Sequence, residues 1–146
     1  MTDLEKVRQW LLGYPAWEEG KLLYIDYTDA VPGNAGLYPN GLEEVSRKTD
    51  VLGNVTVQNR YHFALYRVVD GQEDNTENAA WLMAFQKWVQ SQSAAGLAPQ
   101  FGDEPARERI RAEKGKLKEA SQTGTGTYVV TLTAEFTNYY GGNENE

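Results

Sequence analysis

The chain has 146 residues and a net charge of −7, with one histidine and no cysteine. The lack of cysteine excludes disulfides, thiolate zinc sites and cysteine nucleophiles. The acidic balance opposes the phosphate contacts on which nucleic-acid affinity rests, so a sequence-reading DNA-binding protein is not expected.

The length corresponds to one domain, and we predict a single α+β domain over residues 1–140 with a disordered polar tail at 141–146. No stretch approaches ~20 consecutive apolar residues, and the acidic N-terminus does not resemble a signal peptide. We therefore expect a protein that stays in the cytoplasm and makes no membrane contact.

The first predicted element is a helix over residues 3–12. Thr2 and Glu5 have the spacing of a capping box, and apolar residues follow at helical intervals. Residues 22–28 then predict a short strand. Proline, glycine and asparagine punctuate residues 31–40, which favours a long loop with a short extended segment inside it.

The single histidine, His62, lies in a stretch that alternates with period two. One face carries the apolar residues Val55, Val57, Tyr61, Phe63 and Leu65, and the other carries Thr56, Gln58, Arg60 and His62. Val68 and Val69 are both apolar, which predicts a bulge or a strand end buried on both faces. The preceding residues 42–52 alternate poorly but predict a further strand that ends at Gly53.

The clearest helical pattern covers residues 75–95. Asp74 and Glu77 give a capping signal, and a broad apolar stripe includes Trp81 and Trp88, one heptad apart. Two such rings can stack over a ligand, but packing against a sheet is the stronger interpretation because aromatic side chains bury large areas.

Residues 107–118 are ambiguous, because propensity favours a helix whereas the alternation around Ile110 and Ala112 fits an edge strand. The basic residues of this segment indicate a solvated face rather than a nucleic-acid site: Arg107, Arg109, Arg111, Lys114, Lys116 and Lys118. Residues 127–140 alternate cleanly, with an inward set of Tyr128, Val130, Leu132, Ala134 and Phe136 and an outward set of Thr131, Thr133, Glu135 and Thr137. The predicted fold is α+β: an antiparallel or mixed sheet of about four to five strands packed against two helices.

Motifs for catalysis or metal binding are weak. The serines lie in no nucleophile-elbow context that would pair with His62. The acidic segment 70–81 lacks the glycine and glutamate of an EF-hand loop, and Gly124-Thr125-Gly126 precedes a strand instead of a helix. We predict no catalytic residue, no cofactor and no metal, and composition and spacing alone indicate a binding protein.

Four segments in order carry a resemblance that covers nearly the whole chain. They are LEKVRQWL, NRYHFALYRV, NAAWLMAFQKWVQSQSAAGLAPQFGD and IRAEKGKLKEASQTGTGTYVVTLTAEFTNYY. This order resembles the bacteriophage minor capsid family whose members are similar to tail terminator proteins of long, flexible-tailed phages. The linker Gly96-Leu97-Ala98-Pro99 departs from the family's G-x-L-P-like pattern by one interrupting residue.

The resemblance implies a tail-terminator-like fold with a strand at residues 109–118, in a virion protein of the tail and neck that assembles in the host cytoplasm. It implies a homo-hexameric ring that caps the tail tube protein and offers a surface to the head–tail connector protein. Six copies of a chain with charge −7 carry −42, so an acidic lumen would let DNA pass without specific binding. Ring closure requires two different sticky surfaces on each subunit. The candidates are the loop with Leu37 and Tyr38, the segment 42–52 with Leu42, Val45 and Arg47, and the polar sheet face with Arg60 and His62.

Two other classes stay open. An acidic binding module or inhibitor would act as a monomer or dimer on a basic partner. An enzyme that uses His62 has the least support, and it would lose activity but keep its assembly in the variant His62→Ala.

Overall fold

The computed structural model describes residues 1–70, 76–120 and 125–141, without the side chains of residues 118–120. Its sheet has the strand order β1-β2-β3-β5-β4. The strands are β1 (Leu23–Ile25), β2 (Ala35–Thr49), β3 (Val55–Asp70), β4 (Arg109–Ala120) and β5 (Thr125–Tyr140). β1 runs parallel to β2 and the other neighbouring pairs are antiparallel, so the predicted α+β fold with a mixed sheet is confirmed.

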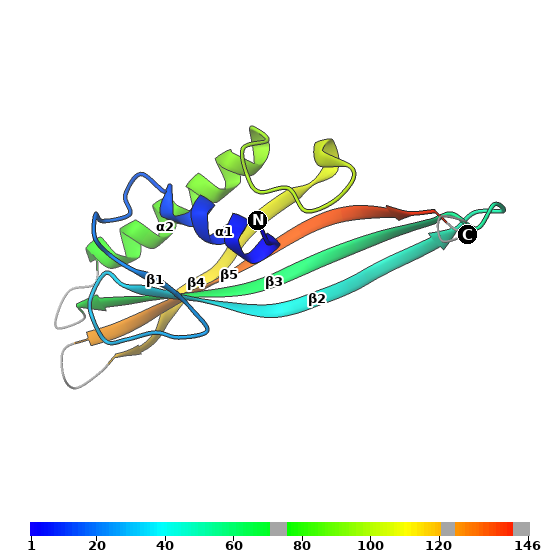
Figure 1. Ribbon diagram of the computed structural model, residues 1–146. Coiled ribbons are helices and arrows are strands. Elements are labelled where there is room, and N and C mark those ends of the chain that lie inside the picture. Colours follow the sequence, from blue (N-terminus) through cyan, green and yellow to red (C-terminus); the bar gives the residue numbers. More distant parts are fainter. Residues whose placement is uncertain (71–75, 121–124, 142–146) are drawn as a thin grey trace.

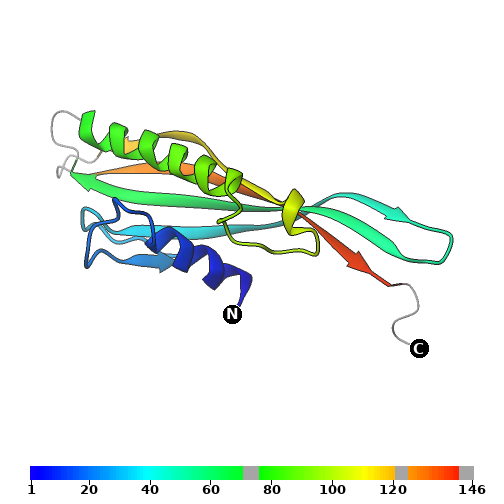
Figure 2. The same ribbon diagram turned by 90° about the horizontal axis from the view of Figure 1, so that it is seen from above.

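Two helices, α1 (Asp3–Leu12) and α2 (Thr76–Ala94), lie on the same face of this sheet (Figures 1 and 2). Both match the predicted helices within a residue. The backbone N–H of Glu5 donates to Thr2 Oγ1 at 3.2 Å, which is the predicted cap of α1. Asp74, the predicted cap of α2, lies outside the described residues. Within the described ranges, neither helix is both long enough and apolar enough to cross a membrane.

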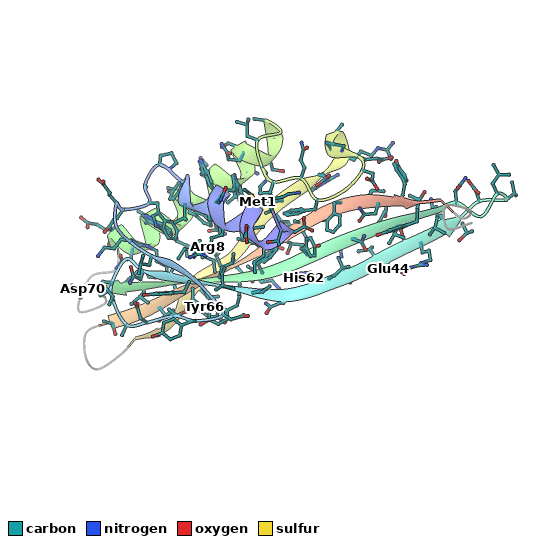
Figure 3. All side chains as sticks on the ribbon, viewed as in Figure 1. Met1, Arg8, Glu44, His62, Tyr66 and Asp70 are labelled. Carbon is teal, nitrogen blue, oxygen red and sulfur yellow. The ribbon has the colours of Figure 1, made fainter. Side chains whose placement is uncertain are left out.

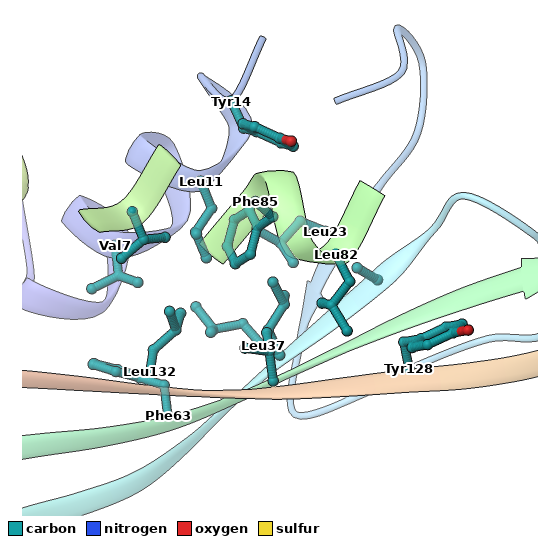
Figure 4. Close-up of a cluster of buried hydrophobic side chains, with 14 of the residues drawn as sticks. Val7, Leu11, Tyr14, Leu23, Leu37, Phe63, Leu82, Phe85, Tyr128 and Leu132 are labelled. Atoms are coloured by element: carbon teal, nitrogen blue, oxygen red, sulfur yellow. The ribbon is translucent and has the colours of Figure 1, made fainter. Parts of the chain in front are cut away.

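The hydrophobic core lies between these helices and the sheet (Figure 4). Its fully buried members include Val7, Leu11, Leu37, Phe85, Val89 and Leu132. An aromatic cluster joins the two helices above it, with Trp10 stacked on Trp88 at 4.9 Å between ring centroids and Trp81 stacked on Phe85 at 5.6 Å. The two heptad-spaced tryptophans therefore pack against the core, as predicted.

The centre of the sheet is the long pairing of β3 with β5, which runs without a register shift from Val55 opposite Tyr140 to Asp70 opposite Thr125. Val68 and Val69 are each 2% exposed, so this end of β3 is buried on both faces and contains no bulge. The predicted inward set of β5 is buried throughout. Thr133, predicted to point outward, is also buried, because neighbouring strands flank it on both sides.

Two predictions about the N-terminal half are confirmed only in part. The predicted strand at residues 22–28 is reduced to three residues, since Asp26 adopts a φ of 55° and turns the chain away. Residues 35–40, predicted as loop with a short extended segment at 36–38, all belong to β2, whose pairing with β3 overrides their turn-forming composition. Pro39 and Gly41 are accommodated at a register shift in this edge strand, where a missing N–H and a positive φ are tolerated.

In β4, pairing with β5 overrides the local helix propensity. The strand implied for residues 109–118 is therefore confirmed. Gly115 lies so close to α2 that a Cβ there would approach Leu82 Cδ2 to 2.7 Å. α2 also covers the outer edge of β4: Ile110 N–H donates to Ser93 Oγ at 3.1 Å, and Gln86 Nε2 donates to the Ala112 carbonyl at 3.2 Å. A short 3-10 helix, η1 (Pro105–Arg107), precedes the strand. Residues 121–124 and the predicted tail residues 142–146 lie outside the described residues.

Candidate functional site

Strands β2, β3 and β5 continue well past the helices and form an elongated extension of the sheet (Figure 1). We call this extension the arm and define it as residues 42–60 together with residues 137–140. The arm exposes six large apolar side chains: Leu42, Val45, Val51, Leu52, Tyr139 and Tyr140. Apolar groups gathered on a projecting element are typical of a contact surface.

The tip of the arm is a tight turn built around Asp50. Its carboxylate accepts the backbone N–H groups of Leu52 at 2.8 Å and Asn54 at 3.0 Å, and Gly53 closes the turn with a φ of 85°. The hydrogen bond from the Asn54 backbone, followed by that from Leu52, lowers the pKa of the Asp50 carboxyl below its usual value. The turn therefore holds Val51 and Leu52 outward in a fixed position, with Val51 fully exposed.

The base of the arm is fixed by the loop that follows α2. Asp103 N–H donates to the Thr137 carbonyl at 2.7 Å, and the Asp103 carboxylate accepts Tyr139 N–H at 2.7 Å. Gly102 lies directly on this strand, since a Cβ there would be 2.3 Å from the Thr137 carbonyl oxygen. The outer edge of β5 within the arm is thus hydrogen-bonded to a loop instead of a strand.

The sheet face opposite the helices, which we call the polar face, carries a chain of ion pairs that crosses four strands. His62 Nε2 lies 2.8 Å from Glu43 Oε1, and Arg60 Nη1 lies 3.9 Å from the same oxygen. Arg60 Nε in turn lies 3.7 Å from Glu135 Oε1. Arg111 of β4 contacts Glu135 as well, so the chain runs from β2 through β3 and β5 to β4.

These contacts shift the pKa values of Glu43 and Arg111 on the polar face. The hydrogen bond from His62, with Arg60 nearby, lowers the pKa of Glu43. Arg111 Nε donates to Glu113 at 2.9 Å, and its bonds to Glu113 and Glu135 raise the pKa of its guanidinium. Both shifts favour the charged forms of Glu43 and Arg111, as expected of structural ion pairs. His62 Nε2 lies within hydrogen-bond distance of the Glu43 carboxylate. Figure 3 shows His62 on the sheet, between the labelled Glu44 and Tyr66.

Two hollows open on the polar face. One of about 490 Å³ lies between the arm and η1 and is lined mainly by polar groups, among them Arg60, Arg109 and Glu135. The other, of about 430 Å³, lies beside Asp29, Tyr38 and Tyr66. His62 lines neither of these hollows but borders a smaller one of about 180 Å³, together with Asp3 and Tyr61. In the part of the chain that the structure describes, no three histidine, aspartate or glutamate side chains gather as a metal site.

The structure divides the predicted interface residues into four groups. Leu37 is fully buried in the core, so its side chain is not available for a subunit contact. Tyr38 is half-buried on the polar face, where its hydroxyl lies 2.8 Å from Thr28 Oγ1 and its ring contacts Tyr66 edge to face. Arg60 and His62 belong to the ion-pair chain, and only Leu42, Val45 and Arg47 lie exposed on the arm.

Sequence reasoning included Val51 and Leu52 only as part of the segment 42–52, and it did not include the β5 end of the arm with Tyr139 and Tyr140. The spacing of Asp50 and Gly53 is a turn signal that would have placed the first two at a hairpin tip. No protein-family model matches this chain, and a search of curated proteins finds no relative.

Proposed function

We propose that this protein is a structural, non-catalytic subunit that assembles through its arm, and that the assembly is the ring at the end of a phage tail tube. The observation that carries the proposal is the arm itself, an ordered three-stranded extension that ends in the exposed Val51 and Leu52. Apolar residues held rigidly away from the core are costly in water unless another surface covers them. The order of sequence segments supports the placement of this subunit at the tail tube.

Ring closure requires that one surface of a subunit meets a different surface of the next subunit. The arm supplies the first surface, because it projects beyond the body formed by the helices and the core (Figure 2). In a hexamer, the arm tip of each subunit would pack against the body of its neighbour. The tail tube protein and the head–tail connector protein would then contact the two sides of the ring, and DNA would pass through without specific binding.

The ion-pair chain on the polar face supports a structural role for His62 and Arg60. A residue that must exchange protons with a substrate needs a free face toward that substrate. Here the ring of His62 contacts Glu43, and Arg60 lies between Glu43 and Glu135. These pairs stiffen the central strands at the root of the arm, which an extended contact element requires.

The test is light scattering over a concentration series, with and without polymerised tail tube protein, followed by electron microscopy of tube ends. We expect a hexamer, or a smaller species that collects at tube ends. The variant Val51→Asp/Leu52→Asp should abolish the ring, because charges replace the apolar tip. Met83→Asp, at an apolar residue that is 68% exposed on α2, tests in parallel whether this part of the body receives the arm tip.

A protein that neither forms rings nor binds tubes at any concentration overturns the proposal. An acidic binding module would then be the better interpretation, and it would show itself by forming a complex with a basic protein. Assembly that survives in the tip variant would also contradict a specific role for the arm.

A further inference from the structure

The outer edge of β2 is open along the arm. β1 pairs only with Ala35–Leu37, and no other segment of the described ranges pairs with the outer edge of β2 from Pro39 to Thr49. In Figure 2 this edge runs along the outer side of the arm, away from the helices. The opposite edge of the sheet differs, because Gln86 and Ser93 of α2 cover β4. Open edges invite pairing with another strand unless charges or bulges prevent it.

The charges on this edge are arranged so that the strand complements itself. Residues 42–49 read LEEVSRKT, with two acids before the centre and two bases after it. When two copies run antiparallel about the centre between Val45 and Ser46, Glu44 stands opposite Arg47 and Glu43 stands opposite Lys48. Opposite charges across neighbouring strands stabilise a sheet, whereas like charges destabilise it.

Facing residues must also lie on the same side of the sheet. Residues three apart in a regular strand, such as Glu44 and Arg47, point to opposite faces. β2 has a register shift between Glu44 and Ser46. The extra residue at this shift reverses the face of the sheet to which the following side chains point. As a result Glu44 pairs with Asn59 and Arg47 pairs with Val57, two residues apart on β3 and therefore on one face.

The second pair obeys the same rule. Glu43 stands opposite Arg60 and Lys48 stands opposite Thr56, so both lie on the polar face. A two-fold axis perpendicular to the sheet keeps every residue on its own face, and the register shift thus allows both charge pairs to form in both copies. A strand without this shift would place the acids and bases on opposite sides.

We propose that the outer edge of β2 binds the same edge of a second copy, antiparallel and about a two-fold axis, with Glu44 facing Arg47 and Glu43 facing Lys48. The contact joins the two sheets into one continuous sheet. Within one subunit Arg47 Nη2 already lies 2.7 Å from Glu44 Oε1, so both side chains are oriented on the exposed surface before pairing. This inference goes beyond the proposed ring, because a two-fold contact uses one surface twice whereas ring closure uses two different surfaces.

Charge reversal tests the pairing without a change of fold. Glu44→Arg alone places arginine opposite arginine, and Arg47→Glu alone places glutamate opposite glutamate. We expect each variant alone to raise the dimer dissociation constant roughly tenfold or more in sedimentation equilibrium. An equimolar mixture of the two variants should recover the dimer, since each arginine then faces a glutamate. Mixing leaves the repulsion inside each subunit unchanged, so recovery reports only the contact between subunits.

Cross-linking tests the register, and the lack of native cysteine keeps the background clean. Oxidation of Glu44→Cys mixed with Arg47→Cys should give a disulfide-linked dimer. Either variant alone, or Glu44→Cys mixed with Thr49→Cys, should give little. Circular dichroism confirms that each variant is folded before the comparison.

A wild-type protein that stays monomeric at all concentrations overturns the inference, as does a mixture that fails to recover the dimer. Cross-linking that is equal in every combination contradicts the register. The proposed ring stands or falls separately, because its test alters Val51 and Leu52 and leaves the charged edge intact.

Discussion

The guanidinium carbon of Arg67 lies 4.0 Å from the centroid of the Trp81 ring, which joins β3 to α2 on the helix side of the sheet. Arg67 is only 8% exposed, and burial lowers the pKa of its guanidinium. Glu18, 3.6 Å away, is the acid that offsets part of this cost. A buried cation over an aromatic face is stabilised by the ring's electron density and by the packing of its own aliphatic stem.

We expect Arg67→Ala to lower the free energy of unfolding by about 2 kcal/mol, because it removes both the ring contact and the buried stem. Arg67→Lys should cost less, since lysine keeps a stem and a charge but loses the planar group. Urea denaturation gives both values. Arg8→Ala, on the exposed side of α1, is the control and should change stability by less than about 0.5 kcal/mol. Equal effects at the two arginines would contradict the role of the tryptophan contact.

Tyr61 ties β3 to the start of α1, because its hydroxyl donates to Asp3 Oδ2 at 2.6 Å. Burial, followed by this hydrogen bond, raises the pKa of Tyr61 from 10.0 to about 12. Tyr61→Phe should lower the free energy of unfolding by about 1–2 kcal/mol at neutral pH, as expected for a lost hydrogen bond to a charged group.

The same pKa shift fixes the pH dependence. A raised pKa in the folded state means that the contribution of Tyr61 is complete below pH 10 and disappears as the pH rises toward about 12. The difference in stability between wild type and Tyr61→Phe should therefore shrink over that interval. A difference that stays constant up to the higher pH would show that the phenol and the carboxylate do not interact.

Gly102 is expected to tolerate no side chain. Its Cβ would lie 2.3 Å from the carbonyl oxygen of Thr137, and backbone atoms cannot move aside as a flexible side chain can. Gly102→Ala should destabilise the fold by about 1–3 kcal/mol and increase hydrogen exchange at Tyr139, whose N–H bonds to Asp103. Unchanged exchange at Tyr139 would contradict the close approach of this loop.

The turn at the tip of the arm should open in acid. The pKa of Asp50 is lowered by the N–H groups that its carboxylate accepts, so the turn is stabilised at neutral pH and loses this support as the pH falls through the lowered pKa. In an NMR titration, the amides of Leu52 and Asn54 should shift with a midpoint below that of an ordinary aspartate. Asp50→Ala should abolish the shift, and a normal midpoint would contradict the hydrogen bonds.

The elements that could be predicted from sequence are those with one face on the core and one face toward solvent, because their apolar and polar residues then alternate in a regular pattern. β3 and β5 alternate because one face packs on the core and the other does not, and α2 has a broad apolar stripe for the same reason. β2 was missed between residues 35 and 40 because Pro39 and Gly41 are turn formers and the strand depends on β3 for its pairing. Local propensity cannot register such a distant partner.

The candidate surfaces divide in the same way. Leu42 and Val45 could be anticipated as exposed apolar residues of a poorly alternating segment. The contacts of His62 with Glu43 and of Arg60 with Glu135 could not, because the first depends on the exact register within the β2–β3 hairpin and the second on pairing between strands distant in sequence. The buried state of Leu37 was hidden for the same reason, since only its position opposite Leu65 places it under the helices.

The position of β5 between β3 and β4 has a consequence for how the chain folds. β2 and β3 are joined by a short turn and can pair as soon as they are made, but the inner edge of β3 has no partner until β5 has been synthesised. The first half of the chain thus emerges as a hairpin with two open edges, and β4 has nothing to join. The sheet is therefore completed late, by pairing between strands that are far apart in sequence. A nascent chain in which β5 has not yet been synthesised is the species most exposed to aggregation.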